Sequence, residues 1–275
     1  MHLGSLYCAV ASYLDARANS GAWIVRIEDL DRPREVAGAA SRILGTLQSF
    51  GFEWDGEALR QSDREELYAA ALRSLGERGL TFPCSCSRAQ LIQEERYPGT
   101  CRERSTPPAA QTAVRLRVEP QEIQFTDRIQ GSYRQDVAAT VGDVILRRRD
   151  GLTAYQLAVV VDDEAQGITH VVRGADLLDN TPRQIYLQRA LNMATPAYAH
   201  VPVLTEPDGG KLAKSRRSVR LDAGAALAQL VAVFGLLGLE PPPKLAQTTL
   251  NEAWTWAIAR WDVSRVPRRL GLPAH

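Results

Sequence analysis

Residues 3–31 have the sequence LGSLYCAVASYLDARANSGAWIVRIEDLD, and this stretch predicts a helix followed by a strand. Apolar residues recur at helical spacing over residues 3–19, and Ser20-Gly21 ends the pattern. The next run, residues 22–27, is rich in β-forming side chains and carries Glu28 to the carboxyl end of the expected strand. A helix followed directly by such a strand is typical of a parallel sheet with helices on its faces.

Helical patterns recur along the rest of the chain. Apolar spacing predicts a second helix through residues 43–50 and a third over residues 63–78. Two further helices are expected over residues 222–237 and 250–261. The last of these follows Thr249-Leu-Asn-Glu252, a pattern that predicts a capping box at its start.

The pattern changes between residues 83 and 134. An irregular, cysteine-bearing stretch is followed there by residues 114–118 and 123–127, which alternate like half-buried antiparallel strands. Strand and helix alternation resumes from Gly142, with a strand expected at residues 144–146. We therefore expect an α/β fold in which an insertion interrupts a Rossmann-like catalytic domain with a parallel sheet. The expected units are residues 1–82 and 135–204 for the split domain, 83–134 for the insertion, and 205–275 for a loop and a small C-terminal helical region.

The composition is that of an ordinary globular protein, with 45% hydrophobic and 24% charged residues. No apolar run reaches the length of a membrane span, and no secretory signal pattern is visible at the start. We expect a cytoplasmic monomer that does not bind membranes. The net charge is +1, so any RNA binding depends on local basic patches, which are otherwise ordinary solvated faces. The candidate patches are residues 147–149, 211–220 and 265–269.

Three of the four cysteines lie close together in the sequence, as Cys84, Cys86 and Cys101. Zn²⁺ binds thiolates tetrahedrally, and a C-x-C pair with a third cysteine supplies three ligands. The four histidines all lie far away in sequence, so the fourth ligand is of another type. The alternative is three free cysteines that hold no metal. The spacing therefore favours a structural zinc site in the insertion.

Two short segments carry features suited to nucleotide chemistry. His2-Leu-Gly-Ser5 places a histidine and a glycine at a helix start, where the helix dipole favours negative charge. Lys211-Leu-Ala-Lys214-Ser215 places two lysines in a glycine-rich loop that could close over a triphosphate. Taken singly, the first segment is weak evidence against an ordinary helix start, and an exposed basic loop is the more common fate of segments like the second. Together they are far more specific.

In this order the two segments resemble the two signatures of the class I aminoacyl-tRNA synthetases. Arg26-Ile-Glu-Asp-Leu-Asp31 resembles the strand-end motif of the glutamyl and glutaminyl branch of that family. Two further segments match the same branch, Tyr155 to Asp163 and Val172-Arg-Gly-Ala-Asp176. The resemblance runs from His2 to about Lys214, in the family's order. It implies an enzyme that activates glutamate with ATP and transfers it to RNA.

Within this branch, the chain is too short to carry the large anticodon-reading domain of a glutamyl-tRNA synthetase. It resembles the truncated paralogues that attach glutamate to the queuosine base at the wobble position of tRNA(Asp). The cysteine pattern, followed by Tyr97-Pro-Gly-Thr-Cys101, matches these paralogues as well. The resemblance implies that Tyr97 is the fourth zinc ligand, through its phenolate oxygen.

The resemblance also implies roles in amino-acid binding, which agree with the chemistry of the side chains. Glu28 would take the ammonium group of glutamate, and Arg173 would pair with a carboxylate. Tyr155 would add a hydroxyl contact and one wall of the pocket. Without the resemblance, a solvated strand end and a surface salt bridge would be the better explanations of the two charged residues.

The implied ATP site uses both signatures. His2, Lys211 and Lys214 would stabilise the charge that builds on the phosphates, with Mg²⁺ bound to ATP. Gly4 and Ser215 would complete the contacts to the nucleotide. Residue 213 is alanine, where the second signature usually has serine, so one hydroxyl is lost.

The start of the chain departs from the family pattern. The resemblance implies a first strand before His2 that ends in a turn of the type F-A-P-S-P-T-G, and this segment supplies an arginine to the pocket. The sequence begins at Met1, immediately before His2. We expect either that the true start lies upstream, which we favour, or that the sheet lacks a central strand. Without that strand, unpaired backbone would reduce folding and activity.

Two alternative functions remain open at this point. One is a shortened glutamyl-tRNA synthetase that charges a tRNA 3′ end. The other is a non-catalytic, zinc-bearing RNA-binding remnant, which would bind RNA without turning over ATP. The presence of Glu28, Tyr155, Arg173 and both signature lysines favours an enzyme, because RNA binding alone requires none of them.

Overall fold

The structure is a computed structural model that describes residues 1–31, 35–87, 89–94, 96–104, 111–205 and 221–274. The first expected helix is confirmed as α1 (Leu3–Ala18), and Asn19 caps its end. Leu6, Val10 and Leu14 are fully buried along one face of this helix. Because these residues recur at helical spacing, the face that the pattern predicts is the face that enters the core.

Only the end of the expected strand over residues 22–27 pairs with another strand. β1 (Arg26–Ile27) lies parallel to β2 (Leu59–Arg60). Ahead of it, the amide of Trp23 donates a 2.8 Å hydrogen bond to the Asp55 carboxylate instead of entering a ladder. The next two helices confirm the sequence patterns, as α2 (Ala39–Ser49) and α3 (Glu65–Glu77).

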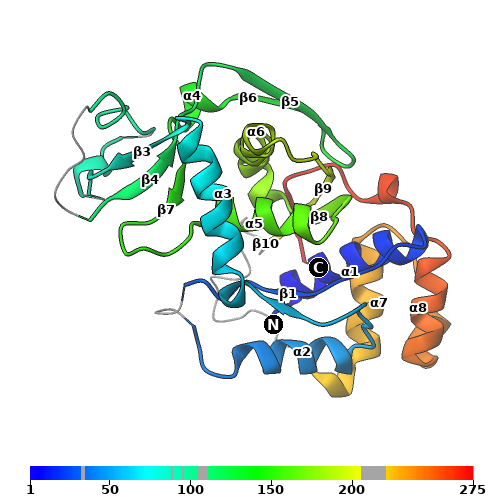
Figure 1. Cartoon of the computed structure of the whole chain (residues 1–275). Coiled ribbons are helices and arrows are strands. Elements are labelled where there is room, and N and C mark those ends of the chain that lie inside the picture. Colours follow the sequence, from blue (N-terminus) through cyan, green and yellow to red (C-terminus); the bar gives the residue numbers. More distant parts are fainter. Residues whose placement is uncertain (32–34, 88, 95, 105–110, 206–220, 275) are drawn as a thin grey trace.

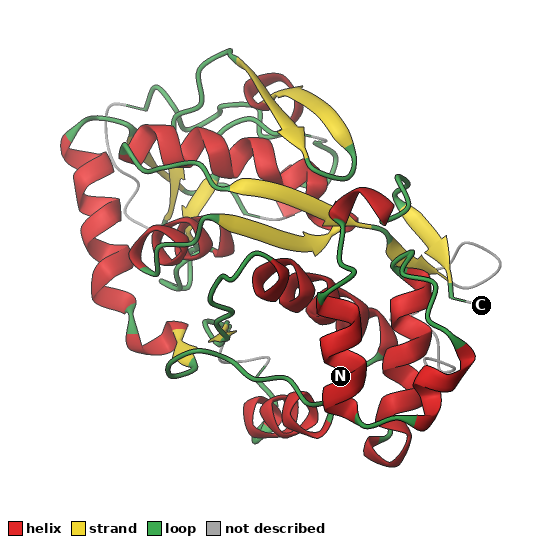
Figure 2. Ribbon diagram, turned by 90° about the vertical axis from the view of Figure 1, so that its right-hand side faces the viewer, coloured by secondary structure: helices red, strands yellow, loops and turns green. Residues whose placement is uncertain are grey.

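A second parallel pair lies in the middle of the molecule. β8 (His170–Gly174) pairs in parallel with β9 (Ala197–Val201), which places Arg173 opposite His200. Figure 2 shows helices on both sides of these central strands. The helices on either side of β8 in the sequence are α5 (Tyr155–Ala165) and α6 (Thr181–Leu191). These pairings confirm the α/β class and the parallel strands.

Among the described residues, the two parallel pairs do not join into one continuous sheet. A cavity of about 370 Å³ lies between them, lined by residues 21–24 on the β1 side and by residues 166–170 and Val172 on the β8 side. Ser12 and Asp15 of α1 line the same cavity. The expectation that a first strand is missing stays a prediction.

A small antiparallel sheet lies at one end of the molecule (Figure 1), and the predicted insertion supplies its central strand. Its strands are β3 (Thr81–Cys84), β4 (Ala113–Leu116) and β7 (Ile145–Arg147). The strand expected at residues 144–146 therefore pairs antiparallel with β4 instead of joining a parallel sheet. The pairing differs from the expectation because the amide of Leu116 bonds to the Val144 carbonyl, which ties this segment to the insertion. The bounds of the predicted domains stay predictions.

A β-hairpin follows β4 in the sequence and lies above α6 in Figure 1. It consists of β5 (Glu122–Asp127) and β6 (Gly131–Asp136), paired residue by residue. Arg128, in its turn, forms a bidentate ion pair with Asp15 of α1 at 2.6 and 2.9 Å. Asp15 is almost fully buried, so this pair fixes the hairpin tip to the first helix. A single turn, α4 (Val137–Thr140), ends the hairpin.

The C-terminal helices confirm the sequence patterns, with later starts or earlier ends than expected. They are α7 (Ala226–Leu236) and α8 (Leu250–Ile258), and the predicted capping box of Thr249 and Glu252 is present. Both helices pack on α1 in the largest core, where Tyr13, Phe52 and Trp254 make edge-on ring contacts. The last strands form a parallel pair, β10 (Val203–Thr205) and β11 (Gly271–Pro273).

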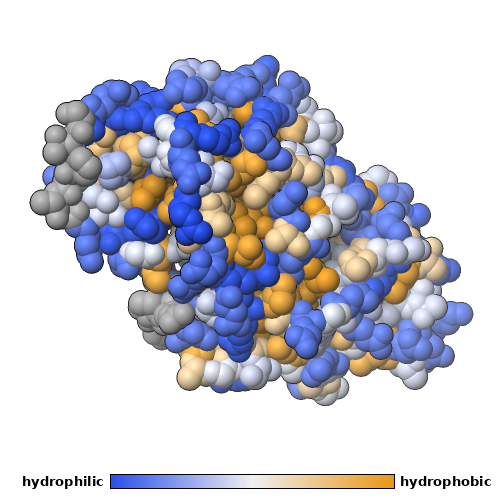
Figure 3. Space-filling model, in the orientation of Figure 1, coloured by the Kyte–Doolittle hydropathy of each residue, from blue (hydrophilic) through white to orange (hydrophobic). Residues whose placement is uncertain are grey.

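A second core joins α3, α5 and α6, and a third fills the insertion. Figure 3 shows hydrophobic surface gathered in the middle of one face, bordered by hydrophilic lobes. Within the described ranges, no helix combines the length and the apolar character needed to cross a bilayer.

Candidate active site

Three predicted site residues converge from distant parts of the chain. Glu28 directly follows β1, Arg173 lies near the end of β8, and Tyr155 is the first residue of α5. Burial raises the pKa of the Tyr155 phenol, while the charge of Arg173 lowers it and that of Glu28 raises it. Both charges therefore lie close enough to this hydroxyl to act on it.

Arg173 is held in a fixed orientation by hydrogen bonds to three side chains. Its Nε donates to His200 Nε2 at 3.0 Å, and its Nη2 donates to Thr181 Oγ1 and Gln184 Oε1, each at 2.8 Å. The guanidinium also lies 5.3 Å from the centroid of the Tyr198 ring. Among the described residues these bonds use Nε and Nη2, which leaves Nη1 for a ligand. A guanidinium held in this way can receive a carboxylate with little loss of side-chain entropy.

Glu28 lies in a negatively charged part of the site. Its carboxylate lies 3.7 Å from Arg26 Nε. Arg26 also forms ion pairs with Asp163 at 2.9 Å and with Asp162 at 3.9 Å. Asp162 also pairs with Arg64 at 2.7 Å. This connected set holds three carboxylates and two guanidiniums, so one negative charge is in excess. An added ammonium group would balance it.

The electrostatics of Glu28 agree with this charge count. Burial raises its pKa above the ordinary value, and the charges of Asp163 and Asp162 add to the increase, while Arg26 opposes it. Its side chain is still 42% exposed, so a ligand can reach it. A carboxylate with a raised pKa gains most from a cationic partner, because the partner favours its charged form.

His2 serves as the N-cap of α1. Its Nδ1 accepts a hydrogen bond from the Ser5 amide at 3.2 Å, and its Nε2 lies 3.1 Å from the Ser5 hydroxyl. A Cβ at Gly4 would lie 3.3 Å from the His2 ring, so the absence of a side chain there lets the imidazole fold over the helix start. Burial lowers the pKa of His2, which favours the neutral ring. Because Nδ1 accepts a hydrogen bond from the Ser5 amide, the proton of the neutral ring lies on Nε2.

The remaining predicted ATP ligands cannot be placed. Lys211, Lys214 and Ser215 lie outside the described residues, which stop at Thr205 and resume at Leu221. Their roles stay predictions.

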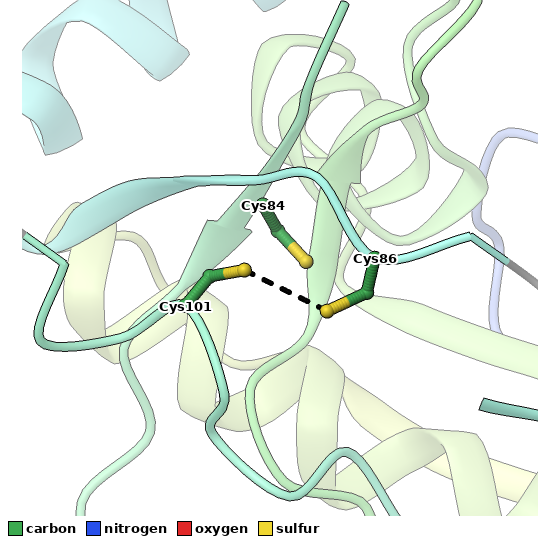
Figure 4. Close-up of side chains that lie close together, drawn as sticks. All are labelled: Cys84, Cys86 and Cys101. Atoms are coloured by element: carbon green, nitrogen blue, oxygen red, sulfur yellow. Dashed lines mark hydrogen bonds between the residues drawn. The ribbon is translucent and has the colours of Figure 1, made fainter. Parts of the chain in front are cut away.

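The three cysteines predicted as metal ligands form a compact cluster (Figure 4). The sulfur atoms of Cys84, Cys86 and Cys101 all lie within 4.8 Å of one another, and those of Cys86 and Cys101 are 3.6 Å apart. Tyr97 Oη lies 3.4 Å from the Cys84 sulfur and accepts a 2.9 Å hydrogen bond from the Cys101 amide. Cys84, Tyr97 and Cys101 are buried.

These distances fit a tetrahedral metal site. With metal–sulfur bonds of about 2.3 Å, two thiolates on one tetrahedron lie about 3.8 Å apart, and a thiolate and an oxygen lie about 3.5 Å apart. Burial alone would raise the pKa of Cys101, but hydrogen bonds from Ser85 and its neighbours lower it to about 6. Burial raises the pKa of Cys86 to about 11 and also that of Tyr97. The three cysteines can therefore hold a metal, which would favour the charged form of every ligand.

A buried arginine accompanies the cluster and was not predicted from the sequence. The Arg115 guanidinium lies 3.8 Å from the centroid of the Tyr97 ring, and it donates to the Asp143 carbonyl at 2.7 Å. A cation over this ring stabilises negative charge on the phenol oxygen. Because Arg115 lies in an ordinary alternating strand, its sequence context gave no signal of this contact.

Several residues that hold the amino-acid site were likewise missed. Arg26 and Asp163 lie inside segments that carry the family resemblance, but their pairing joins positions 137 residues apart. Thr181, Gln184 and His200 lie outside those segments and contact Arg173 only in the folded chain. No sequence pattern could have connected them.

The geometry of fold and site agrees with the comparison to known families. Residues 1–241 match the family described as tRNA synthetases class I (E and Q), catalytic domain. The chain belongs to this family.

Curated relatives refine this class. The chain is 53% identical to Glutamyl-Q tRNA(Asp) synthetase of Pseudomonas aeruginosa PAO1 over 274 residues, which cover 99% of the chain and 93% of that relative. It is 51% identical to the protein of the same name from Pseudomonas fluorescens Pf-5, over 99% of the chain and 92% of the relative.

Solved structures support the fold. The chain superposes with a TM-score of 0.83 on a glutamate tRNA ligase from Elizabethkingia meningosepticum in complex with its amino acid, at 22% identity. The Glutamate-tRNA Synthetase of Elizabethkingia anophelis gives the same score at 23% identity. The two superpositions cover 100% and 99% of this chain. They cover only 64% and 65% of the two solved chains. At this identity the comparison shows the class I synthetase catalytic fold and nothing beyond it.

Proposed function

We propose that this protein activates glutamate with ATP to form glutamyl-adenylate and then transfers the glutamyl group to the queuosine base in the anticodon of tRNA(Asp). The relatives that are about half identical to it over almost its whole length are named Glutamyl-Q tRNA(Asp) synthetase, after this reaction. The proposal is carried by the placement of Glu28 beside the Arg26–Asp163 ion pair and of Arg173 in a fixed orientation. The charges of Glu28 and Arg173 both act on the Tyr155 phenol, which supports an anionic and a cationic side of one site.

Glutamate has charges that complement this site. Its ammonium group would pair with Glu28, where the neighbouring carboxylates leave an excess of negative charge. Its side-chain carboxylate would pair with Arg173. The α-carboxylate must stay free of a guanidinium, because it is the nucleophile that attacks the α-phosphate of ATP. The site therefore selects an amino acid with a second carboxylate.

The activation step needs no covalent enzyme intermediate. An α-carboxylate oxygen attacks the α-phosphate in line, the bond to the β-phosphate oxygen breaks, and pyrophosphate leaves with its electron pair. His2 Nε2 and the α1 start would stabilise the charge on the α-phosphate, and Lys211 and Lys214 that on the leaving group. Mg²⁺ bound to ATP would neutralise further phosphate charge.

The insertion would contribute a structural zinc ion. Cys84, Cys86 and Cys101 would supply three thiolates and Tyr97 a phenolate, with Arg115 reducing the excess negative charge. A closed set of four protein ligands leaves no open position, as in structural sites. The ion would stabilise the fold of the insertion and take no part in the adenylation chemistry.

The proposed partners are therefore ATP, glutamate and queuosine-bearing tRNA(Asp). A protein that uses ATP and tRNA would work in the cytoplasm, and the relatives are bacterial.

Two assays test the proposal. The first is glutamate-dependent exchange of pyrophosphate into ATP without tRNA, which we expect to occur with the wild-type protein and to be lost in Glu28→Ala. Glu66→Gln, an exposed change on α3, is the control that should keep full activity. Absence of exchange in the wild-type protein that also carries the expected first strand ahead of His2 would reject glutamate activation.

The second assay identifies the acceptor. We expect the glutamyl group to reach tRNA(Asp) that contains queuosine, and neither unmodified tRNA(Asp) nor tRNA(Glu). Charging of tRNA(Glu) would instead show a shortened glutamyl-tRNA synthetase. RNA binding without any ATP turnover would show a non-catalytic RNA-binding protein.

A further inference from the structure

A buried acid–histidine pair lies behind the amino-acid site and has no role in the chemistry described above. Asp127, at the end of β5, and His200, on β9, are 2% and 0% exposed. Asp127 Oδ2 lies 2.6 Å from His200 Nδ1. Its other oxygen accepts backbone hydrogen bonds from Ile129, Gln130 and His200 at 2.8 to 3.1 Å. A side chain this buried and this well bonded has a single orientation.

The hydrogen bonds determine which nitrogen of His200 carries the proton. An ionised carboxylate only accepts, so His200 Nδ1 must be the donor to Asp127. The neutral ring then has its lone pair on Nε2, and this atom receives the N–H of Arg173 Nε at 3.0 Å. A chain of donors therefore runs from Arg173 through His200 to Asp127.

The charges around the pair support the neutral ring of His200. Burial lowers the pKa of His200, and the charge of Arg173 adds to this effect, while Asp127 and Asp176 oppose it. Burial alone would raise the pKa of Asp127, but hydrogen bonds from His200 and from the Gln130 and His200 amides lower it. Near neutral pH the pair is therefore a carboxylate and a neutral imidazole.

We propose that Asp127 and His200 are positioning residues that hold the Arg173 guanidinium in the orientation in which it binds the side-chain carboxylate of glutamate. This inference rests on the proposed function. Thr181 and Gln184 hold Nη2, and His200 holds Nε, so two of the three nitrogens are fixed and Nη1 remains for the substrate. The β5–β6 hairpin thereby acts on amino-acid binding without touching the substrate.

Asp127→Asn separates positioning from packing. If Oδ1 keeps its backbone hydrogen bonds, the new NH₂ group faces His200 Nδ1, and an NH₂ group cannot accept. The proton of His200 then moves to Nε2, where it meets the N–H of Arg173. We expect the KM for glutamate to rise about tenfold or more, since a hydrogen bond to a charged group is lost, while the KM for ATP stays within about twofold.

His200→Gln and His200→Asn form a matched pair. Gln can place a carbonyl oxygen near the position of Nε2 and accept from Arg173, whereas the shorter Asn reaches only toward Asp127. We expect partial rescue of the glutamate KM in His200→Gln compared with His200→Asn. His170→Gln, at the exposed start of β8, is the control that should leave both KM values unchanged. A merely structural role would lower the melting temperature of the variants and leave the glutamate KM unaltered.

The tautomer of His200 can be measured directly, independently of enzyme activity. Long-range ¹H–¹⁵N correlation spectra of the four histidines should contain one neutral ring protonated on Nδ1 that disappears in His200→Gln. In Asp127→Asn we expect that ring to be protonated on Nε2. An imidazolium or an Nε2–H tautomer of His200 in the wild type would overturn the inference. An unchanged glutamate KM in Asp127→Asn would overturn it as well. Absence of glutamate-dependent exchange in the wild-type protein that carries the expected first strand would instead reject the proposed function, while the spectra would still decide the state of the pair.

Discussion

The cysteine cluster and the amino-acid site are assembled in opposite ways. Cys84, Cys86, Tyr97 and Cys101 lie within one short segment, and a few turns of the insertion bring them together. The amino-acid site joins β1, α5 and β8, and Glu28 and Arg173 are 145 positions apart in the sequence. A local cluster depends on its own ligands, whereas a site spread over the fold depends on every element that aligns it. The two sites should therefore fail independently.

The largest effect should come from Arg173→Lys. Lysine keeps the charge but loses the guanidinium that bonds His200, Thr181 and Gln184. Its ammonium therefore cannot occupy the same position. We expect kcat/KM for glutamate in pyrophosphate exchange to fall roughly 100- to 1,000-fold, as when one partner of a buried charge pair is removed. Arg189→Lys, an exposed change on α6, is the control. Full activity of Arg173→Lys would place glutamate elsewhere.

Removal of the metal should separate the two regions most clearly. A strong chelator should lower the melting temperature by several degrees, because metal binding contributes directly to the stability of such a cluster. Glutamate-dependent exchange, measured below the new melting temperature, should keep its KM within about twofold, since the amino-acid site uses none of the cysteines. Loss of glutamate binding in step with the metal would show that the two regions are coupled.

A smaller effect is expected from Glu28→Gln. The amide keeps the shape of the carboxylate but cannot balance an ammonium group, and it leaves Arg26 with one fewer carboxylate. The KM for glutamate should rise about tenfold, as for one lost charge-assisted hydrogen bond, with little change for ATP. An equal rise in both KM values would mean that the change disturbs the whole site.

The smallest effect is a dependence of glutamate binding on pH. The pKa of Glu28 is raised by burial, so this carboxylate is neutralised at a higher pH than an ordinary glutamate. Lowering the pH from neutral toward the ordinary pKa range of a glutamate carboxyl should therefore raise the KM for glutamate. Glu28→Gln should show a weaker dependence, because its amide does not titrate. An identical pH profile in the two proteins would show that another group is responsible.

The sequence was sufficient where structure depends on neighbours along the chain. Helical spacing predicted α1, α3 and α8, and the capping box at Thr249 formed as its pattern indicated. The C-x-C spacing and a third cysteine predicted a compact sulfur cluster. In each case the residues that interact lie within one short segment, so local spacing carries the necessary information.

Where structure depends on distant partners, the sequence was less informative. Of the run over residues 22–27 only two residues pair, because strand length depends on the neighbouring strand as well as on β-propensity. The strand at residues 145–147 has an ordinary β pattern, and only its partner β4 makes it antiparallel. Glu28, Tyr155 and Arg173 were found through family resemblance, but their support from Arg26, Asp163 and His200 required the folded chain.

The central claim is that Glu28 and Arg173 grip opposite ends of one glutamate molecule. A crystal structure of the protein with L-glutamate tests it most directly. We expect the side-chain carboxylate within hydrogen-bond distance of Arg173 Nη1, the ammonium beside Glu28, and the α-carboxylate directed toward the start of α1. Glutamate bound with its side-chain carboxylate away from Arg173, or in another cavity, would contradict the account.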